Sequence, residues 1–377
     1  MRGLGAKGSR VQVKDRFFTA SGILSFAFPR LAPLAPGILE PLNPFFEFGG
    51  FMTRPKVLIT QKIFDEAVAL VKELFEVDYN PSDTPLPPSL LVKRLQEMKG
   101  AITLLTDSID ERLLSQCPEL KIVSNVAVGY NNIDVEACTR HGVMVTNTPG
   151  VLDETTADFT WTLLLATARR LVEADSFLRS SRWKGWGLMQ FLGHDVHHKV
   201  LGICGLGRIG QGVARRAMGF EMKVLYTDAV RAAPSIEEAL GAQFVEKQVL
   251  LARSDFVTLH IPLTPQTTHY ISVPELELMK PGSILINASR GPVVDEKALV
   301  KALLKGKIAG AGLDVYEREP QVEPDLVGMA NVVLAPHIAS ASGETRLRMA
   351  TMAAENMIAG LMGKRPPNLV NAGAFCE

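Results

Sequence analysis

From Lys56 onward, short apolar runs alternate with amphipathic stretches, and this alternation constrains the fold more than any other feature of the sequence. The apolar runs have the length and the flanking breakers of buried strands, whereas stretches such as FDEAVALVKELF have the periodicity of helices. Strands that alternate with helices predict parallel βαβ units with helices on both faces of each sheet. The first predicted strands are KVLIT (56–60), AITLLT (101–106), KIVSNVA (121–127) and VMVTNT (143–148).

A second series of six apolar runs follows a long helical stretch, from about Thr155 to Arg179. Six strands with helical crossovers predict a doubly wound sheet of the dinucleotide-binding type. These strands are VLGIC (200–204), KVLYT (223–227), DFVTLH (255–260), SILINA (283–288, the fourth), GAGLDV (310–315) and VVLAP (332–336).

We therefore predict an α/β protein with two doubly wound parallel-sheet domains and a cleft between them. A Rossmann-type cofactor domain is expected at 151–339, and a flavodoxin-like substrate domain at 52–150 and 340–377. The last predicted helix, from about Gly343 to Met362, follows the second series of strands and is expected to pack on the substrate domain.

Residues 1–51 differ from the rest of the chain and show no sustained helical or strand period. Through Arg30 they hold six basic residues against one acid, Asp15. A basic, acid-poor start is typical of organelle transit peptides, but the match to that pattern is weak. MTRPKVLIT opens directly into the first predicted strand, so we favour Met52 as the natural start and residues 1–51 as a disordered extension without chemistry.

Charge and composition argue against several classes of partner. Forty basic residues balance forty acidic ones, so net charge gives no reason to expect nucleic acid or an anionic membrane. The four cysteines form no CxxC pair, which predicts neither a disulfide framework nor a zinc site and fits a reducing cytoplasm. No apolar stretch reaches the roughly 18 residues of a membrane-spanning helix. HDVHH places His194, His197 and His198 at helical spacing, but without further ligands it is interpreted as a solvated turn, and no metal is expected.

The segment GICGLGRIG places Gly205, Gly207 and Gly210 in the spacing G-x-G-x-x-G, between a predicted strand and a predicted helix. That context predicts a dinucleotide site: the first glycine permits a tight turn, the second lets the backbone approach a pyrophosphate, and the third allows close helix–strand packing. Asp228 ends the next strand, where a carboxylate accepts the ribose hydroxyls of NAD and repels a 2′-phosphate. NADH is the expected cofactor, while the nearby Arg231 leaves NADPH open.

Three ionisable residues fall just after predicted strands of this second series: Arg290, Glu319 and His337. Ligands of doubly wound sheets bind beyond the carboxyl ends of the strands. Each residue alone is also explained by a surface turn or a satisfied loop. Together they supply what hydride transfer to a 2-oxo acid requires, namely a cation for the carboxylate and a histidine kept protonated by an acid. Gly291 and Pro292 are expected to turn the chain away after Arg290.

The sequence resembles the D-isomer-specific 2-hydroxyacid dehydrogenases, and within them the glyoxylate/hydroxypyruvate reductases. The resemblance runs from about Pro55 to Asn371 and rests on VGYNNID, GLGRIGQ, LHIPLTPQTTHYI, INASRGPVVDE, AGAGLDVYEREP, NVVLAPHIAS and PPNLVN. It implies NAD(P)H-dependent reduction of glyoxylate or hydroxypyruvate to glycolate or D-glycerate.

The resemblance also implies a role for each matching residue. Arg290 would bind the substrate carboxylate and carbonyl oxygen, and Glu319 would hold His337 protonated as the proton donor. The further residues implied to contact substrate are Leu105, Thr106, Val128, Gly129, Trp186 and Ser340. Those implied to contact the cofactor, besides the three glycines and Asp228, are Thr156, Arg208, Ile209, Pro262, Ala288 and Asp314.

Some expectations stay open at this point. RWKGWG resembles a segment that reaches a neighbouring subunit, so Trp186 is a candidate for substrate contact across a homodimer, with ordinary packing as the alternative. The sequence departs from the family at Ala339, where glycine is common, and at Asp228, where several reductases carry a small or polar residue followed by arginine. The other functions considered are an NADH-sensing corepressor of the same fold and a dehydrogenase for another 2-hydroxy acid, such as D-lactate.

Overall fold

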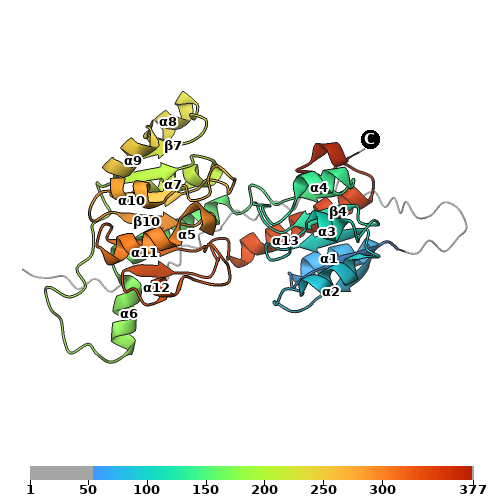
Figure 1. Ribbon diagram of the computed structural model, residues 1–377, viewed down its shortest axis with the longest axis horizontal. Coiled ribbons are helices and arrows are strands. Elements are labelled where there is room, and N and C mark those ends of the chain that lie inside the picture. Colours follow the sequence, from blue (N-terminus) through green and yellow to red (C-terminus); the bar gives the residue numbers. More distant parts are fainter. Residues whose placement is uncertain (1–53, 376–377) are drawn as a thin grey trace, which may run out of the picture. The chain divides into compact units, whose positions relative to one another are not determined.

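The computed structural model describes residues 54–375, so the extension predicted for residues 1–51 lies outside the described residues. Two parallel sheets organise this part of the chain (Figure 1). Half of the twelve strands in these residues are buried along their whole length, as their apolar sequences predict. The predicted α/β class with two doubly wound sheets is confirmed. No helix among the described residues is long and apolar enough to cross a membrane.

The smaller sheet has five parallel strands rather than the four predicted, in the order β2-β1-β3-β4-β5, which is the order of a flavodoxin-like sheet. Its strands are β1 (Lys56–Ile59), β2 (Glu76–Tyr79), β3 (Gly100–Thr103), β4 (Ile122–Asn125) and β5 (Met144–Thr146). Its helices are α1 (Asp65–Leu74), α2 (Pro88–Leu95), α3 (Glu111–Leu114), α4 (Val135–Arg140) and α13 (Gly343–Leu361), with a 3-10 turn at Ala372–Ala374. As expected, α13 packs on this sheet, against α1, β3 and β4, and Ser124 donates a 2.7 Å hydrogen bond to the carbonyl oxygen of Ala353.

The larger sheet has seven parallel strands rather than the six predicted, in the order β12-β11-β10-β9-β6-β7-β8. Its strands are β6 (Val200–Cys204), β7 (Lys223–Thr227), β8 (Ala242–Phe244), β9 (Phe256–Leu259), β10 (Ile284–Asn287), β11 (Gly310–Leu313) and β12 (Val332–Leu334). The extra strand, β8, has three residues and lies at the sheet edge, too short to give a pattern. The prediction that SILINA is the fourth strand of this sheet is therefore wrong, because β10 is the fifth strand of the seven-stranded sheet in chain order.

Helices on this second sheet bring the loop residues to its edge. They are α5 (Asp153–Ala168), α6 (Leu171–Arg179), α7 (Arg208–Met218), α8 (Pro234–Leu240), α9 (Lys247–Arg253), α10 (Val273–Leu278), α11 (Glu296–Leu304) and α12 (Pro324–Val327), with a 3-10 turn at Gly291–Val293. The glycine loop joins β6 to α7, and β6 lies beside β9 and β7, where the strand order reverses. This switch point is the usual ligand-binding edge of such a sheet.

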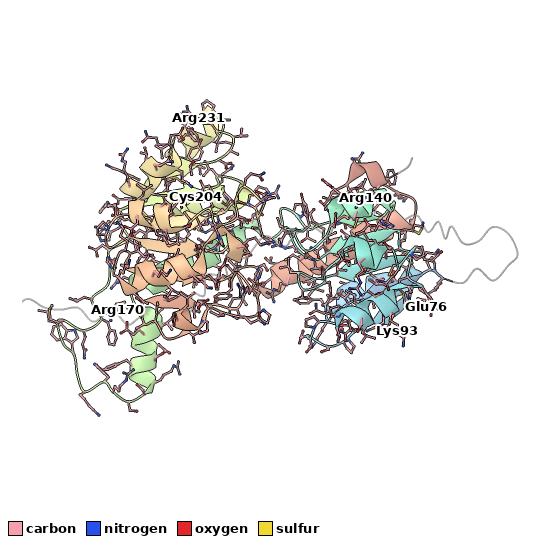
Figure 2. All side chains as sticks on the ribbon, in the orientation of Figure 1. Glu76, Lys93, Arg140, Arg170, Cys204 and Arg231 are labelled. Atoms are coloured by element: carbon pink, nitrogen blue, oxygen red, sulfur yellow. The ribbon has the colours of Figure 1, made fainter. Side chains whose placement is uncertain are left out.

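The prediction of one helix from about 155 to 179 is wrong, because α5 and α6 are separated at Arg170, which has a left-handed φ of 51° (Figure 2). The reason is a tertiary contact that local periodicity does not reveal. The chain returns at Gly193 and His194, and the N–H of His194 donates 2.8 Å to the carbonyl oxygen of Ala168, the last residue of α5. A Cβ on Gly193 would lie 2.3 Å from that oxygen, so the segment containing Gly193 and His194 packs directly against the C-terminal end of α5. This contact satisfies a carbonyl at the end of the helix.

Candidate active site and dinucleotide loop

The glycine loop between β6 and α7 has a backbone that only glycine fits at two positions. Gly205 has a φ of +94°, and a Cβ there would lie 2.7 Å from the carbonyl oxygen of His260. A Cβ on Gly210 would lie 2.1 Å from the carbonyl oxygen of Gly205, so Gly210 lets α7 approach the loop. At Gly207, by contrast, a Cβ would meet no protein atom within 4 Å, which leaves room for a ligand to approach the backbone.

The groups around this loop fit a dinucleotide. The first turn of α7, beginning at Arg208, presents N–H groups of the kind that bind a pyrophosphate. Asp228 follows β7, and its Oδ2 accepts a 2.7 Å hydrogen bond from the N–H of Leu206, which ties the ribose-binding candidate to the loop. Arg208 is exposed, and its Nε donates to Oδ2 of Asp153 at 2.9 Å. Open space, a helix N-terminus and a carboxylate are what this class of ligand requires.

The three ionisable candidates follow three neighbouring strands of the same sheet. Arg290 follows β10, Glu319 follows β11 and His337 follows β12. These strands are parallel and adjacent in the order β12-β11-β10, so their carboxyl ends lie along one edge. The topology thus brings together residues that are well separated in the sequence.

His337 and Glu319 form a hydrogen-bonded pair. Nδ1 of His337 lies 2.8 Å from Oε2 of Glu319, and Oε1 of Glu319 accepts from the N–H of Tyr316 at 3.1 Å. Burial acts to raise the pKa of Glu319, but the hydrogen bond and charge of His337, with smaller effects of Tyr316 and Arg290, hold that pKa below its ordinary value. The carboxylate therefore stays ionised and holds the ring at Nδ1, while the other ring nitrogen, Nε2, is not engaged by Glu319.

The loop that carries His337 is held by Asp314, at the end of β11. The N–H groups of Ile338 and Ala339 donate to its two carboxylate oxygens at 2.7 and 2.8 Å. Asp314 is fully buried, and this burial raises the pKa of its carboxyl. His337 itself has a left-handed φ of 53°, a conformation that a non-glycine residue adopts only when its surroundings enforce it. Asp314 therefore orients the histidine loop, and its expected contact with a nicotinamide stays a prediction.

Arg290 is partly buried and directs its guanidinium toward the segment that contains Gly129. Its Nε donates 2.8 Å to Oδ1 of Asn131, and its Nη1 donates 2.7 Å to the carbonyl oxygen of Ser289. A Cβ on Gly129 would lie 1.8 Å from Nη2, so only glycine permits this approach. Burial lowers the pKa of Arg290 while the charge of Glu319 opposes the shift, and the guanidinium remains a cation.

The turn after Arg290 is fixed by close backbone packing. Gly291–Val293 forms a 3-10 turn, which confirms that Gly291 and Pro292 turn the chain away. A Cβ on Gly291 would lie 1.8 Å from the carbonyl oxygen of Tyr316, so this turn lies directly against the segment leading to Glu319. The loops of Arg290 and Glu319 therefore support each other.

The backbone of Val128 and Gly129 is oriented by two asparagines. Asn147 donates 2.8 Å to the carbonyl oxygen of Val128, and Asn125 donates 3.2 Å to that of Gly129. Within residues 54–375, the N–H groups of Val128 and Gly129 donate to no protein acceptor. Two such donors beside a guanidinium form a suitable site for a carboxylate.

Sequence reasoning missed Asn131, whose side chain contacts Arg290 directly. The signal was present in VGYNNID, where two asparagines follow Gly129 and Tyr130. The second of them, Asn132, is structural: its amide donates to the carbonyl oxygens of Leu104 and Asp107 at 3.2 and 2.8 Å, which holds the loop after β3.

The other predicted contact residues lie at several places. On the loop after β3, Leu105 is partly buried and Thr106 is exposed and contacts Gln61. Trp186 is 81% exposed on the segment between α6 and β6. The remaining candidates are buried (Thr156, Ala288), partly buried (Ile209, Ser340) or exposed (Pro262).

The other histidines have different surroundings from His337. His260 is partly buried and bonds Thr258 at 2.9 Å, and desolvation lowers its pKa to about 3, so its ring stays neutral. His269 pairs with Glu317 at 2.5 Å. His194, His197 and His198 are all exposed, and residues 54–375 contain no group of three or more His, Cys, Asp or Glu side chains placed to hold a metal ion.

Comparison with known proteins agrees with this geometry. Residues 161–339 match the family model described as D-isomer specific 2-hydroxyacid dehydrogenase, NAD binding domain. A glyoxylate reductase of Thermococcus litoralis is 50% identical over 322 residues, which cover 84% of this chain and 97% of the relative. The chain belongs to the D-isomer specific 2-hydroxyacid dehydrogenases. It is accordingly an NAD(P)-dependent oxidoreductase, and its seven-stranded sheet forms a nicotinamide-dinucleotide domain.

Two solved structures have the same fold as this chain. The TT0316 protein from Thermus thermophilus is 41% identical with a TM-score of 0.79, over 84% of this chain and 99% of that one. An NADPH-dependent glyoxylate/hydroxypyruvate reductase from Sinorhizobium meliloti, in complex with NADP and malonate, is 33% identical with a TM-score of 0.77, over 86% of this chain and 99% of that one.

Proposed function

We propose that this dehydrogenase reduces glyoxylate, hydroxypyruvate or both to the corresponding 2-hydroxy acid. The observation that carries the proposal is the arrangement at one sheet edge: His337 paired with Glu319 at 2.8 Å, and Arg290 directed at the backbone of Gly129. The name of the Thermococcus relative, at 50% identity over nearly its whole length, supports the choice of substrate. One hydroxymethyl group is worth only about 1–3 kcal/mol of discrimination, so we expect both acids to react.

In the proposed reaction, Arg290 and the N–H groups of Val128 and Gly129 bind the substrate carboxylate. Arg290 also polarises the carbonyl oxygen, and Nε2 of His337 donates its proton to that oxygen as negative charge develops there. When bound at the glycine loop, the nicotinamide supplies the hydride. Glu319 acts through His337: it holds Nδ1, fixes the ring and stabilises its protonated form.

NADH is the proposed cofactor. The hydrogen bond from the N–H of Leu206 holds the carboxylate of Asp228 beside the glycine loop. A carboxylate at this position accepts ribose hydroxyls and repels a 2′-phosphate. The Sinorhizobium reductase was solved with NADP, whereas the matching family model is described as NAD binding. We propose that the loop after β7 determines which of the two nucleotides this chain prefers.

We also propose a homodimer in a reducing cytoplasm. In Figure 1, α6 and the segment after it extend away from the helices on the seven-stranded sheet, and α6 has no buried residue. Large apolar side chains are exposed along this arm: Leu171, Val172, Leu178, Trp183, Trp186, Leu188, Met189 and Leu192. An apolar surface of this kind favours a protein partner, and a second copy would bring Trp186 to its neighbour.

The buried free thiols of Cys117, Cys138 and Cys204 support the proposed reducing cytoplasm.

The test is a steady-state panel of small 2-oxo acids with NADH and with NADPH. Rapid turnover of glyoxylate or hydroxypyruvate is expected, and His337→Ala should lower kcat by roughly 100- to 10,000-fold without changing nucleotide binding. Unchanged turnover in this variant would remove His337 from the proton-donor role. Turnover only with pyruvate would favour a D-lactate dehydrogenase. Tight NADH binding without turnover of any acid would favour the corepressor-like alternative.

A further inference from the structure

Arg231 lies shortly after Asp228, on the loop between β7 and α8 (Figure 2). Its guanidinium does not extend freely into solvent, although the side chain is 63% exposed. Nε and Nη2 donate to the two carboxylate oxygens of Glu237, in α8, at 2.9 and 2.8 Å, and the guanidinium carbon lies 5.8 Å from the centre of the Phe244 ring. The cation nearest in sequence to the ribose-binding carboxylate is therefore paired with α8.

Glu237 is itself held in place from inside the domain. The hydroxyl of Tyr226, a fully buried residue of β7, donates 2.6 Å to Oε1 of Glu237, and it accepts 2.9 Å from the N–H of Ala232. The hydrogen bonds from Arg231 and then Tyr226 lower the pKa of Glu237 to about 2, so this carboxylate is ionised at every pH at which the enzyme works. Burial and the neighbouring Glu237 raise the pKa of Tyr226, so its hydroxyl remains a donor.

This pair differs from an ordinary surface ion pair. Exposed pairs contribute little because two mobile side chains must be ordered for one contact. Here one partner, Glu237, is only 13% exposed and is already fixed by Tyr226, and the contact uses two parallel N–H···O bonds. Arg231 therefore loses a defined, bidentate partner whenever it turns toward a ligand at Asp228.

We propose that Glu237 is a determinant of cofactor specificity, because it withholds Arg231 from a 2′-phosphate. NADPH is then disfavoured twice: Asp228 repels its phosphate, and the one nearby cation on this loop is already engaged. The inference rests on the proposed binding of NADH at the glycine loop. It predicts that substitutions at Asp228 and Glu237 act together, since removing the repulsion gives only part of the gain in NADPH affinity while Arg231 stays paired.

The experiment measures Kd for NADH and for NADPH by fluorescence titration, without any 2-oxo acid. Four full-length proteins are compared: the wild type, Asp228→Ser, Glu237→Gln and the double variant. Gln at 237 keeps an oxygen for Tyr226, and thermal melts check that each variant folds. Asp228→Ser is expected to tighten NADPH binding roughly tenfold and Glu237→Gln alone less than threefold. The double variant should gain at least tenfold more than the product of the two single effects.

Two controls identify the residue responsible. Glu238→Gln removes the same charge from the adjacent, exposed position of α8, so Asp228→Ser with Glu238→Gln should bind NADPH like Asp228→Ser alone. Adding Arg231→Met to the double variant should abolish the extra gain. Simple multiplication of the single effects, an equal gain from Glu238→Gln, or a gain that survives Arg231→Met would each overturn the inference.

Binding and turnover also separate this inference from the proposed function. Wild-type protein that prefers NADPH would show that Arg231 is not withheld. NADH binding without reduction of any acid would contradict the proposed reaction but leave the specificity test intact. Binding of neither nucleotide would contradict both.

Discussion

Arg290 and Arg231 both follow strands of the seven-stranded sheet, Arg290 after β10 and Arg231 after β7. Arg290 is partly buried, yet among residues 54–375 its hydrogen bonds reach only neutral oxygens, those of Asn131 and Ser289. Arg231 is mostly exposed, yet it has a carboxylate partner in Glu237. A partly buried cation without an anion is costly unless a ligand supplies one, whereas an exposed cation with a fixed anion is withdrawn from binding. The pairing of each arginine, rather than its exposure, indicates what it does.

The largest effect expected from this comparison of the two arginines comes from the same substitution at both positions. Arg290→Lys removes the planar fork that binds a carboxylate and a carbonyl together, so kcat/KM for glyoxylate should fall roughly 100- to 1,000-fold. Arg231→Lys should leave NADH-dependent kcat/KM within about twofold, because this side chain is proposed to contact neither substrate nor NADH. Both values come from one steady-state assay. Equal losses in the two variants would contradict the comparison.

The second prediction concerns Glu319, the carboxylate that pairs with His337. Glu319→Gln keeps the shape of the side chain but removes the charge that favours the protonated imidazole. We expect kcat to fall roughly 10- to 100-fold and the alkaline limit of reduction to move to lower pH. The depressed pKa of Glu319 in the wild type means that this carboxylate is ionised down to more acidic pH than an ordinary glutamate, so the acidic side of the profile should change less. A pH profile with an unmoved alkaline limit would indicate that Glu319 only shapes the loop.

The sequence predicted the sheet edge but not the pairing of its side chains. Local signals, namely an apolar run and the breakers after it, were enough to predict most strands and the glycine loop. They also predicted the positions of Arg290, Glu319 and His337. The edge strands β2 and β8 were missed because EVDY is half-buried and charged and AQF has only three residues. The partners Asn131 and Glu237 depend on how loops fold back, and Asn131 lies 159 residues from Arg290 in the chain.

The histidines also differ in whether a carboxylate pairs with them, and this difference predicts that the stability of the fold depends on pH. Within residues 54–375, His260 has no carboxylate partner, and burial lowers its pKa from 6.5 to about 3. The unfolded chain therefore binds a proton below about pH 6.5 that the folded chain does not bind, so stability is present above that pH and is lost as the pH falls toward 3. Between pH 7.5 and 5.0 this amounts to about 2 kcal/mol, measurable by urea unfolding at fixed protein concentration.

The variant His260→Gln should lose this part of the pH dependence, and His197→Gln should keep it, because His197 is exposed. If wild type and His260→Gln lose equal stability between the two pH values, the buried ring does not stay neutral as inferred.

The smallest expected effect is obtained by giving Arg290 the kind of partner that Arg231 has. Asn131→Asp replaces a neutral oxygen 2.8 Å from Nε with a charged one, and a hydrogen bond to a charged group is stronger by about 1 kcal/mol or more. Substrate must then compete for Arg290, so KM for glyoxylate should rise roughly tenfold while kcat and KM for NADH change little. Asn131→Ala removes the neutral acceptor without adding charge and should change KM less than threefold. If the two variants behave alike, Asn131 does not position Arg290, and the contrast between the arginines reduces to their burial. A KM that rises only with aspartate would show that Arg290 binds substrate because no carboxylate within residues 54–375 holds it first.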